Sequence, residues 1–564
     1  MHAQAHAGNG RGHSSPTNPP EAKGQAPAVP GRAAPARQSR APPPSRALAD
    51  TASRDAAPTP LGVCARLRRV EPAYLELKER LAEVVDLLKT RALLGWDQQV
   101  KMPPGGGPVR AEQLATLDRL AHERFTSPEI GRLLDRLEGF ESSMPYESDE
   151  ASFVRVTRQD WEKARRVPTD LRAEMSRASS LALPVWAEAR ASSDYSLFRP
   201  HLEHNLELRR RYVECFDNYA EPYDALLDDF ERGMTAAEVR VVFDRLKEEQ
   251  VPLVAAVANE GERPARDREF PLEAQQRFEL KVLERFGYDP QSWRLDPTVH
   301  PFANSVAIDD IRLTTRYHES NLDGLFATMH EFGHGLYEHG VSRDLERTPL
   351  ARGTSLGLHE SQSRLWENLV GRSLPFWRHF YPQLQEHFPD ALGEVELDEW
   401  YRSVNWVSPS FVRVEADEAT YNLHVILRFE LEQELLAGDV PLDDLPGVWS
   451  ERMVQYLGVE PPDDRLGVLQ DMHWAGGHIG YFATYALGNV ISAQLWERIT
   501  EEIPDLYDGF EQGEFGELRA WLVEHLHRHG RKFTPKEMLE RIVGGGIDAG
   551  PYLRYLRDKL GVAA

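Results

Sequence analysis

The spacing of apolar and polar positions predicts a mostly helical protein. Apolar residues recur at steps of three and four along most of the chain downstream of residue 70, as on one face of an α-helix. The segments with this pattern are 72–95, 110–139, 169–193, 198–230, 235–260, 270–286, 320–339, 357–389, 416–437, 480–502 and 515–530. We therefore expect a mainly α fold with many helices.

One stretch has a different period. Residues 303–317, ANSVAIDDIRLTTRY, alternate apolar and polar positions and contain β-branched residues, which is typical of strands. They predict a small sheet directly before the helix expected at 320–339. The run MPPGGG at 102–107 predicts a turn between the first two helices.

The first 62 residues differ from the rest of the chain. They are rich in alanine and proline, contain no aromatic residue and lack the apolar core of a secretory signal. Such a composition buries too little apolar surface to order itself. We therefore expect a disordered tail at 1–62 and a catalytic domain at 63–564.

The helix expected at 320–339 contains the box His330-Glu331-Phe332-Gly333-His334. Residues four apart lie one turn apart on the same helix face, so His330 and His334 can bind one zinc ion from a single element. Glu331 lies beside them, where a carboxylate can take a proton from water. The alternative is that the box occurs by chance. A zinc site is therefore supported only if the remaining residues of such a site are found further along the chain.

A catalytic zinc ion needs a third protein ligand and an open position. The segment 357–369, GLHESQSRLWENL, has helical periodicity and carries His359 and Glu360. Glu360 is the natural third ligand of a His-His-Glu site. A lone glutamate on a helix is more often a solvated surface residue. The sequence around Glu360 favours a ligand role instead.

Several phrases in order resemble the carboxypeptidase Taq family, the family 32 metallocarboxypeptidases. The phrase HEFGHGLYEHG is followed by HESQSRLWEN, and both are preceded by His-Pro-Phe at 300–302 and Asp-x-Arg-x-Thr at 310–314. Further matches are LLGWDQQVKMPPGGGPVRAEQLATLDRLAHE at 93–123, VRVEADEATYNLHVILRFELE at 412–432, GVLQDMHW at 467–474, and HRHGRKFTP and PYLRYLRDKLG near the end. The resemblance covers about residues 70–562.

The resemblance implies a gluzincin peptidase whose two helical lobes enclose a deep central cleft, with the small sheet near the zinc site. It implies a zinc-dependent carboxypeptidase of broad specificity that releases single residues from peptides with a free C-terminus. His330, His334 and Glu360 would hold one Zn²⁺ per chain, and Co²⁺ would be a possible substitute because metal selection depends on geometry and supply. Glu331 would be the general base.

The tetrahedral intermediate of peptide hydrolysis carries an oxyanion that needs hydrogen-bond donors. His473, Tyr481 and Tyr485 are the candidates, because related gluzincins place a histidine and a tyrosine pair at similar spacing. Two tyrosines four residues apart also suit a packed helix face. The family usually has phenylalanine where Ile479 stands and proline where Ala483 stands, so these two positions can alter the loop that carries the tyrosines.

A carboxypeptidase must also recognise the terminal carboxylate, and a guanidinium group pairs with both of its oxygens. The family supports Arg413 for this role, and Arg312 is a second candidate. An ion pair of Arg413 with Glu415 or Asp417 is the alternative. The family places His300 on the substrate cleft, although it could also be a core histidine.

The charge and the cysteine content exclude several classes of protein. The formal net charge is −24, from 66 basic and 90 acidic residues, which argues against nucleic acid as a partner. The chain contains two cysteines and no apolar run long enough for a membrane span, so we expect no membrane association. A reducing compartment is the simplest interpretation, and we expect a cytoplasmic homodimer.

Two other functions remain open. An endopeptidase or oligopeptidase could use the same zinc-binding residues, and hydrolysis of a peptide and its C-terminal amide distinguishes it from a carboxypeptidase. An inactive zinc- or peptide-binding protein is the third possibility, but the presence of Glu331 argues against it. His525, His527 and His529 alternate without a completing carboxylate or cysteine, so we interpret them as structural.

Overall fold

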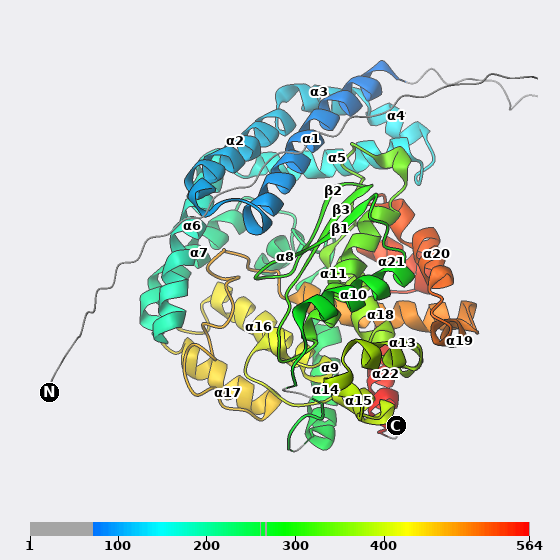
Figure 1. The fold of residues 1–564 in the computed structure, drawn as a ribbon. Coiled ribbons are helices and arrows are strands. Elements are labelled where there is room, and N and C mark those ends of the chain that lie inside the picture. The colour runs from blue at the N-terminus through cyan, green and yellow to red at the C-terminus, as the bar shows by residue number, and fades with distance from the viewer. Residues whose placement is uncertain (1–70, 260, 266–267, 563–564) are drawn as a thin grey trace, which may run out of the picture. The chain divides into compact units, whose positions relative to one another are not determined.

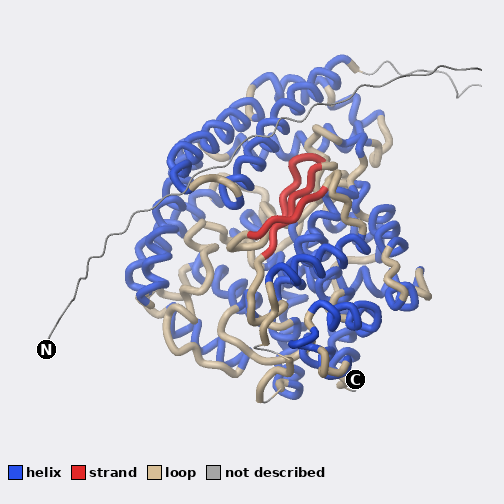
Figure 2. The backbone as a smooth tube through the Cα atoms, in the orientation of Figure 1, coloured by secondary structure: helices blue, strands red, loops and turns tan. Residues whose placement is uncertain are grey.

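The computed structural model describes residues 71–259, 261–265 and 268–562. The tail expected at 1–62 lies outside these residues. The described residues belong to one compact unit that is mainly helical with one small sheet. Figure 1 shows the order of the elements, and Figure 2 shows the strands surrounded by helices.

The first part of the chain is helical up to the sheet. Helices α1 and α2 lie side by side and are joined by the MPPGGG turn predicted from the sequence (Figure 1). The bounds are α1 Pro72–Val100, α2 Gly107–Phe125, α3 Pro128–Arg136, α4 Glu138–Ser143, α5 Asp149–Arg166, α6 Thr169–Ser192, α7 Tyr195–Val213, α8 Pro222–Leu227, α9 Ala236–Val257 and α10 Leu272–Phe286.

The sheet has three strands in the order β1-β3-β2, so β2 is an edge strand. They are β1 Trp293–Pro297, β2 Ala303–Ala307 and β3 Asp310–Thr315. Strands β1 and β3 are parallel, with Trp293 opposite Ile311, whereas β2 and β3 are antiparallel. The prediction of strands within 303–317 is confirmed.

The remaining helices follow the sheet. A π-helical stretch at Leu365–Val370 continues directly from α12. The bounds are α11 Asp323–Gly340, α12 Leu356–Arg364, α13 Leu374–His387, α14 Pro389–Leu392, α15 Leu397–Val404, α16 Glu418–Ala437, α17 Leu445–Leu457, α18 Ala483–Glu502, α19 Leu506–Glu511, α20 Gly516–His525, α21 Pro535–Val543 and α22 Gly550–Leu560.

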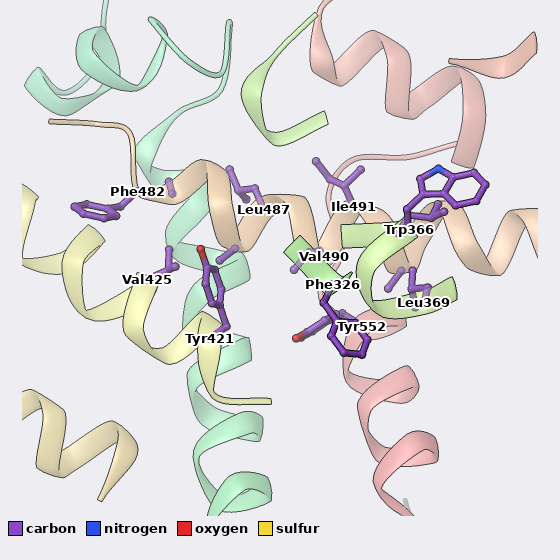
Figure 3. Close-up of a cluster of buried hydrophobic side chains, with 14 of the residues drawn as sticks. Phe326, Trp366, Leu369, Tyr421, Val425, Phe482, Leu487, Val490, Ile491 and Tyr552 are labelled. Carbon is purple, nitrogen blue, oxygen red and sulfur yellow. The ribbon is translucent and has the colours of Figure 1, made fainter. Parts of the chain in front are cut away.

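Helices α11, α12, α16 and α18 meet around an extensive apolar core. Figure 3 shows part of it, where side chains from several helices and from the π-helical stretch interdigitate. The labelled members are Phe326, Trp366, Leu369, Tyr421, Val425, Phe482, Leu487, Val490, Ile491 and Tyr552. Close packing of this kind leaves little freedom to the polar side chains that the same helices carry.

The structure differs from the predicted segments in several places. The helices expected at 110–139 and 198–230 are each interrupted, and in each case the next helix begins with a proline, Pro128 or Pro222. Proline suits this position because the first turn of a helix does not need the backbone donor that proline lacks. Helices α15, α17, α19, α21 and α22 were not predicted. Helix α5 and strand β1 were also not predicted. The first is rich in charged residues, and the second has only five residues and contains a proline.

Among the described residues, none of the helices combines the length and apolar character that crossing a membrane requires.

Candidate active site

Three predicted ligands meet at one point. The side chains of His330 and His334 from α11 and Glu360 from α12 offer ligand atoms that all lie within 4.8 Å of one another. Nε2 of His330 lies 3.6 Å from Oε2 of Glu360, and Nε2 of His334 lies 3.4 Å from the same oxygen. Two imidazoles and one carboxylate are a donor set that suits a divalent metal ion.

Hydrogen bonds hold both histidines in the orientation that a metal requires. Nδ1 of His330 lies 2.9 Å from the carboxylate of Glu367, and Nδ1 of His334 lies 2.7 Å from Nδ1 of His359. Nε2 of His359 is in turn 3.0 Å from Glu338. With a proton on Nδ1 of each ligand histidine, Nε2 of both is free to bind a cation, so the residues present fit a metal.

The third ligand is held by a charged neighbour. Nε of Arg364 donates to Oε1 of Glu360 at 2.7 Å, which leaves Oε2 facing the histidines. Burial opposes ionisation, but the charge of Arg364, helped by the neighbouring histidines, outweighs it and holds the pKa of Glu360 well below its usual range. Glu360 is therefore an anion at neutral pH, as a metal ligand must be.

Close packing places α12 against α11 and α18. A Cβ atom at Gly333 would lie 2.4 Å from the carbonyl oxygen of Gln362, and one at Gly488 would lie 2.4 Å from Cγ of Glu360. Only glycine permits these distances. Buried Glu231 accepts a hydrogen bond from the backbone N–H of Gly357 in the first turn of α12. The position of Glu360 thus depends on contacts with three other parts of the chain.

Glu331 lies beside the ligands on the buried side of α11, with 8% of its surface exposed. Burial raises its pKa to about 7, and the amide of Ala303 in β2 and the charge of His330 act in the opposite direction. A carboxyl group in this environment can both accept and return a proton near neutral pH.

His473, Tyr481 and Tyr485 come together next to the metal ligands. Nε2 of His473 is 3.3 Å from the hydroxyl of Tyr485, and the rings of Tyr481 and Tyr485 are 5.2 Å apart. Burial raises the pKa of both tyrosines, and the nearby Glu360 carboxylate adds to the shift. Both hydroxyl groups therefore stay protonated and can donate.

The loop that carries these residues is fastened by Glu432 of α16. Its carboxylate accepts hydrogen bonds from Nε1 of Trp474 at 2.9 Å, the N–H of Gly480 at 2.9 Å and the hydroxyl of Tyr223 at 2.7 Å. Ile479 and Ala483, the two departures from the family pattern, are both buried in the core. They do not separate the tyrosines.

Arg413 is buried and already has partners. Its Nη2 donates to Oδ1 of Asp471 at 2.8 Å and its Nη1 to the hydroxyl of Tyr421 at 2.8 Å, while Asp471 also binds Arg428. The expected alternative partners Glu415 and Asp417 are not the ones observed. The guanidinium carbon lies 4.7 Å from the ring centre of Tyr485, so Arg413 adjoins the oxyanion candidates.

The structure does not bring Arg312 and His300 to the metal ligands. Arg312 in β3 forms two hydrogen bonds of 2.9 Å with Asp310 and lies over the ring of Trp96. His300 is exposed in the loop before β2. No contact joins either residue to the ligands in the described part of the chain.

Sequence reasoning missed the residues that orient the ligands, although two of them follow a simple spacing. Glu338 lies four residues after His334, and Glu367 lies seven after Glu360, so each shares a helix face with a ligand. No comparable signal marks Asp471 or Glu432, which act on residues of other segments.

A cavity of about 850 Å³ opens beside the metal ligands. His334 and His359 lie on its wall, together with Ala303, Asn304 and Ser305 of the edge strand β2. A strand edge next to a catalytic site can pair with an extended peptide. The cavity has room for a segment of several residues.

The helical fold, the His-His-Glu set and the adjoining Glu331 define a metallopeptidase. The sequence profile of the carboxypeptidase Taq (M32) metallopeptidase family matches residues 76–560. The chain belongs to this family and is a metallocarboxypeptidase, a hydrolase that acts on peptides and uses a metal cofactor.

Relatives and solved structures agree. The chain is 43% identical over 502 residues to thermostable carboxypeptidase 1 of Thermus thermophilus, covering 87% of this chain and 98% of that protein. It is 37% identical to carboxypeptidase 1 of Bacillus subtilis, covering 87% and 97%. The crystal structure of M32 carboxypeptidase from Deinococcus radiodurans R1 is similar with a TM-score of 0.84 and 42% identity, covering 87% of this chain and 99% of that one.

Proposed function

We propose that the protein is a zinc carboxypeptidase of broad specificity, with Zn²⁺ held by His330, His334 and Glu360 and with Co²⁺ as a possible substitute. The convergence of these three ligands beside Glu331 is the observation that carries the proposal. Zinc, when bound in such a set, activates water and polarises the scissile carbonyl.

Glu331 acts as the general base. It takes a proton from the attacking water and later gives it to the leaving amine. Burial raises its pKa to about 7, which supports both directions of transfer near neutral pH. His473, Tyr481 and Tyr485 donate hydrogen bonds to the developing oxyanion. This role is supported by the 3.3 Å contact of His473 with the Tyr485 hydroxyl and by the Glu360 carboxylate, which helps to raise the pKa of both tyrosines.

Arg413 binds the terminal carboxylate of the substrate. Asp471 and Tyr421 hold its guanidinium group in one orientation, and each terminal nitrogen keeps a second N–H for the substrate. The rings of Tyr421, Phe482 and Tyr485 surround it. Aromatic walls of this kind accept many side chains, which supports broad specificity.

We also propose that the protein works as a homodimer in the cytoplasm. The low cysteine content supports a reducing compartment. Sedimentation at several concentrations would test the dimer, and a single species with the mass of one chain would contradict it.

The central experiment uses a peptide with a free C-terminus and its C-terminal amide, with metal analysis of the same preparation. We expect one zinc per chain, stepwise release of single residues from the free acid, and much slower release from the amide. Internal fragments, or equal rates for the two peptides, would indicate an endopeptidase. Loss of activity on chelation and its return with Zn²⁺ or Co²⁺ would support the metal assignment.

A further inference from the structure

The cavity beside the metal ligands contains two arginines that form no hydrogen bond or ion pair through their guanidinium groups within the described part of the chain. Basic residues outnumber acidic ones on its wall, although the whole chain has a net charge of −24. The side chains of Arg209 from α7 and Arg352, just before α12, both line the cavity. Within the described ranges, neither guanidinium group has a hydrogen bond or an ion pair to another residue.

The acidic residues of the wall are already engaged. Asp160 binds Arg531 and Arg232, each at 2.8 Å, and Asp228 and Asp229 bind Lys163 at 2.6 and 2.7 Å. Glu338 is bound to His359 and to the N–H of Gly353. Among the described residues, none of these carboxylates forms a direct ion pair with Arg209 or Arg352, although Asp160 and Glu338 lie near enough to act on the charge of Arg352, and Asp229 on that of Arg209.

The surroundings of both arginines disfavour their positive charge. The positive charge of Arg531 lowers the pKa of Arg352 to about 10, although Asp160 and Glu338 act in the opposite direction. Partial burial lowers the pKa of Arg209, although Asp229 acts in the opposite direction. Arg209 also adjoins the loop of His473 and Tyr481, because a Cβ atom at Gly477 would lie 3.0 Å from its Nη2. An anion entering the cavity would gain two charged donors without having to displace an existing partner.

The position of the cavity indicates which part of a substrate reaches these arginines. Arg413 does not line it, whereas the ligand His334 and the edge strand β2 do. A peptide whose terminal carboxylate binds Arg413 therefore crosses the metal ligands and places the residues upstream of the scissile bond in the cavity. This direction rests on the role proposed for Arg413.

We propose that Arg209 and Arg352 form a subsite for acidic side chains upstream of the scissile bond, so that the enzyme prefers peptides with aspartate or glutamate there. A guanidinium group that has no ion-pair partner binds a carboxylate well, because its planar fork matches both carboxylate oxygens. The subsite acts in addition to recognition of the terminal carboxylate.

The test uses acetylated alanine hexapeptides that end in phenylalanine. One residue, two to four places before the scissile bond, is glutamate, glutamine or lysine, and kcat/KM is measured for release of phenylalanine. We expect glutamate to be preferred over glutamine roughly 5- to 30-fold at one of these positions, and lysine to be disfavoured. The preference should shrink in about 0.5 M salt, because screening weakens charge interactions.

Variants then assign the preference to its residues. Arg209→Gln and Arg352→Gln should each reduce the glutamate-to-glutamine ratio, the double variant should bring it close to one, and Arg352→Glu should shift preference towards lysine. Arg352→Lys keeps the charge and should keep most of the ratio. Arg528→Gln, which removes an exposed arginine outside the cavity, is the control for a change in overall charge.

A ratio near one in the wild type at every position, or an unchanged ratio in a folded double variant, would overturn the acidic subsite. A purely structural role predicts equal losses on all peptides and an unchanged ratio. The two proposals fail separately. If the glutamine peptides are not shortened from the C-terminus, the proposed function is wrong; if they are shortened and glutamate adds nothing, only the subsite is wrong.

Discussion

At the scale of single residues, the surroundings assign different roles to neighbours of the same chemical type. Glu331 and Glu360 are both buried carboxylates near the same histidines. Arg364 holds the pKa of Glu360 low, whereas Glu331 has no arginine partner among the described residues and burial raises its pKa to about 7. One carboxylate is therefore a permanent anion that can bind metal, and the other can exchange a proton.

Glu331→Gln should retain zinc and lose nearly all turnover. The amide keeps the shape of the side chain but cannot accept the proton, so we expect kcat to fall on the order of 10²- to 10⁴-fold. Metal analysis and peptide hydrolysis on one preparation provide the measurement. Turnover close to that of the wild type would show that another group is the base.

Arg413→Ala should abolish the preference for free-acid peptides over their amides. Loss of a charged pair in a partly dry site corresponds to roughly 30- to 1000-fold in kcat/KM. The melting temperature should fall as well, because Asp471 and Tyr421 lose a partner. Arg312→Ala is the matched variant and tests the second candidate.

If Arg413 serves only to pair with Asp471, the variant will melt earlier but still discriminate acid from amide. A preserved ratio in Arg413→Ala would therefore exclude the anchoring role. Loss of the ratio in Arg312→Ala instead would transfer that role to Arg312.

At the scale of elements, the site depends on how closely helices approach one another. Helix α12 carries Glu360 and packs against α18 at Gly488, where even a methyl group has no space. Ser355 and Glu231 bind backbone amides in the first turn of α12, which fixes the start of the helix. The third ligand is thus positioned by its whole helix.

Gly488→Ala should weaken metal binding, because the new methyl group would push against Cγ of Glu360. We expect a lower zinc affinity and destabilisation of about 1–3 kcal/mol, the usual range for overpacking. Gly447→Ala in α17 is the control, since nothing lies within 4 Å of its Cβ position, and it should stabilise the protein slightly. Equal zinc affinities in both variants would contradict this account.

The contact between α10 and α11 should make stability depend on pH. Glu279 of α10 is buried and accepts a hydrogen bond from Thr328 of α11 at 3.0 Å. Burial raises its pKa from 4.5 to about 8. Between these values the unfolded chain releases a proton that the folded protein retains, so the contribution of Glu279 becomes increasingly unfavourable as pH rises through this window.

Glu279→Gln removes this titration. The melting temperature of the variant relative to the wild type should therefore rise from about pH 5 to about pH 9, by several degrees in total. Thermal unfolding at a series of pH values checks it, with the zinc content held constant. A difference that does not change with pH would show that Glu279 titrates normally.

At the scale of the whole molecule, the apolar core is large compared with the metal site. Its buried residues extend from α6 to α22, and the ligands occupy only part of α11 and α12. We therefore expect the core to hold the fold together when the ion is removed. This differs from small domains whose folding depends on metal.

Removal of the metal by a chelator should abolish activity and leave the helical circular dichroism signal nearly unchanged. The melting temperature should fall by a few degrees, because a ligand that binds only the folded state stabilises it through its affinity. Zinc should restore activity. Loss of most helical signal at room temperature would show that the ion is required for the fold.

The sequence alone determined the helical class, the strands β2 and β3 and the candidate ligand set. These features have short periods or fixed phrases, because residues four apart share a helix face whatever the rest of the chain does. The fixed spacing of the His-Glu-x-x-His box also allowed Glu331 to be identified as the candidate general base.

Only the tertiary structure decided which groups act on those residues. Asp471 reaches Arg413 and Glu432 fastens the loop of His473, although each pair is far apart in sequence. Arg209 and Arg352 are also far apart in sequence, and the tertiary structure places both on the wall of one cavity. Their partners, or the lack of partners, result from the packing of distant helices, and no local period in the chain encodes such contacts.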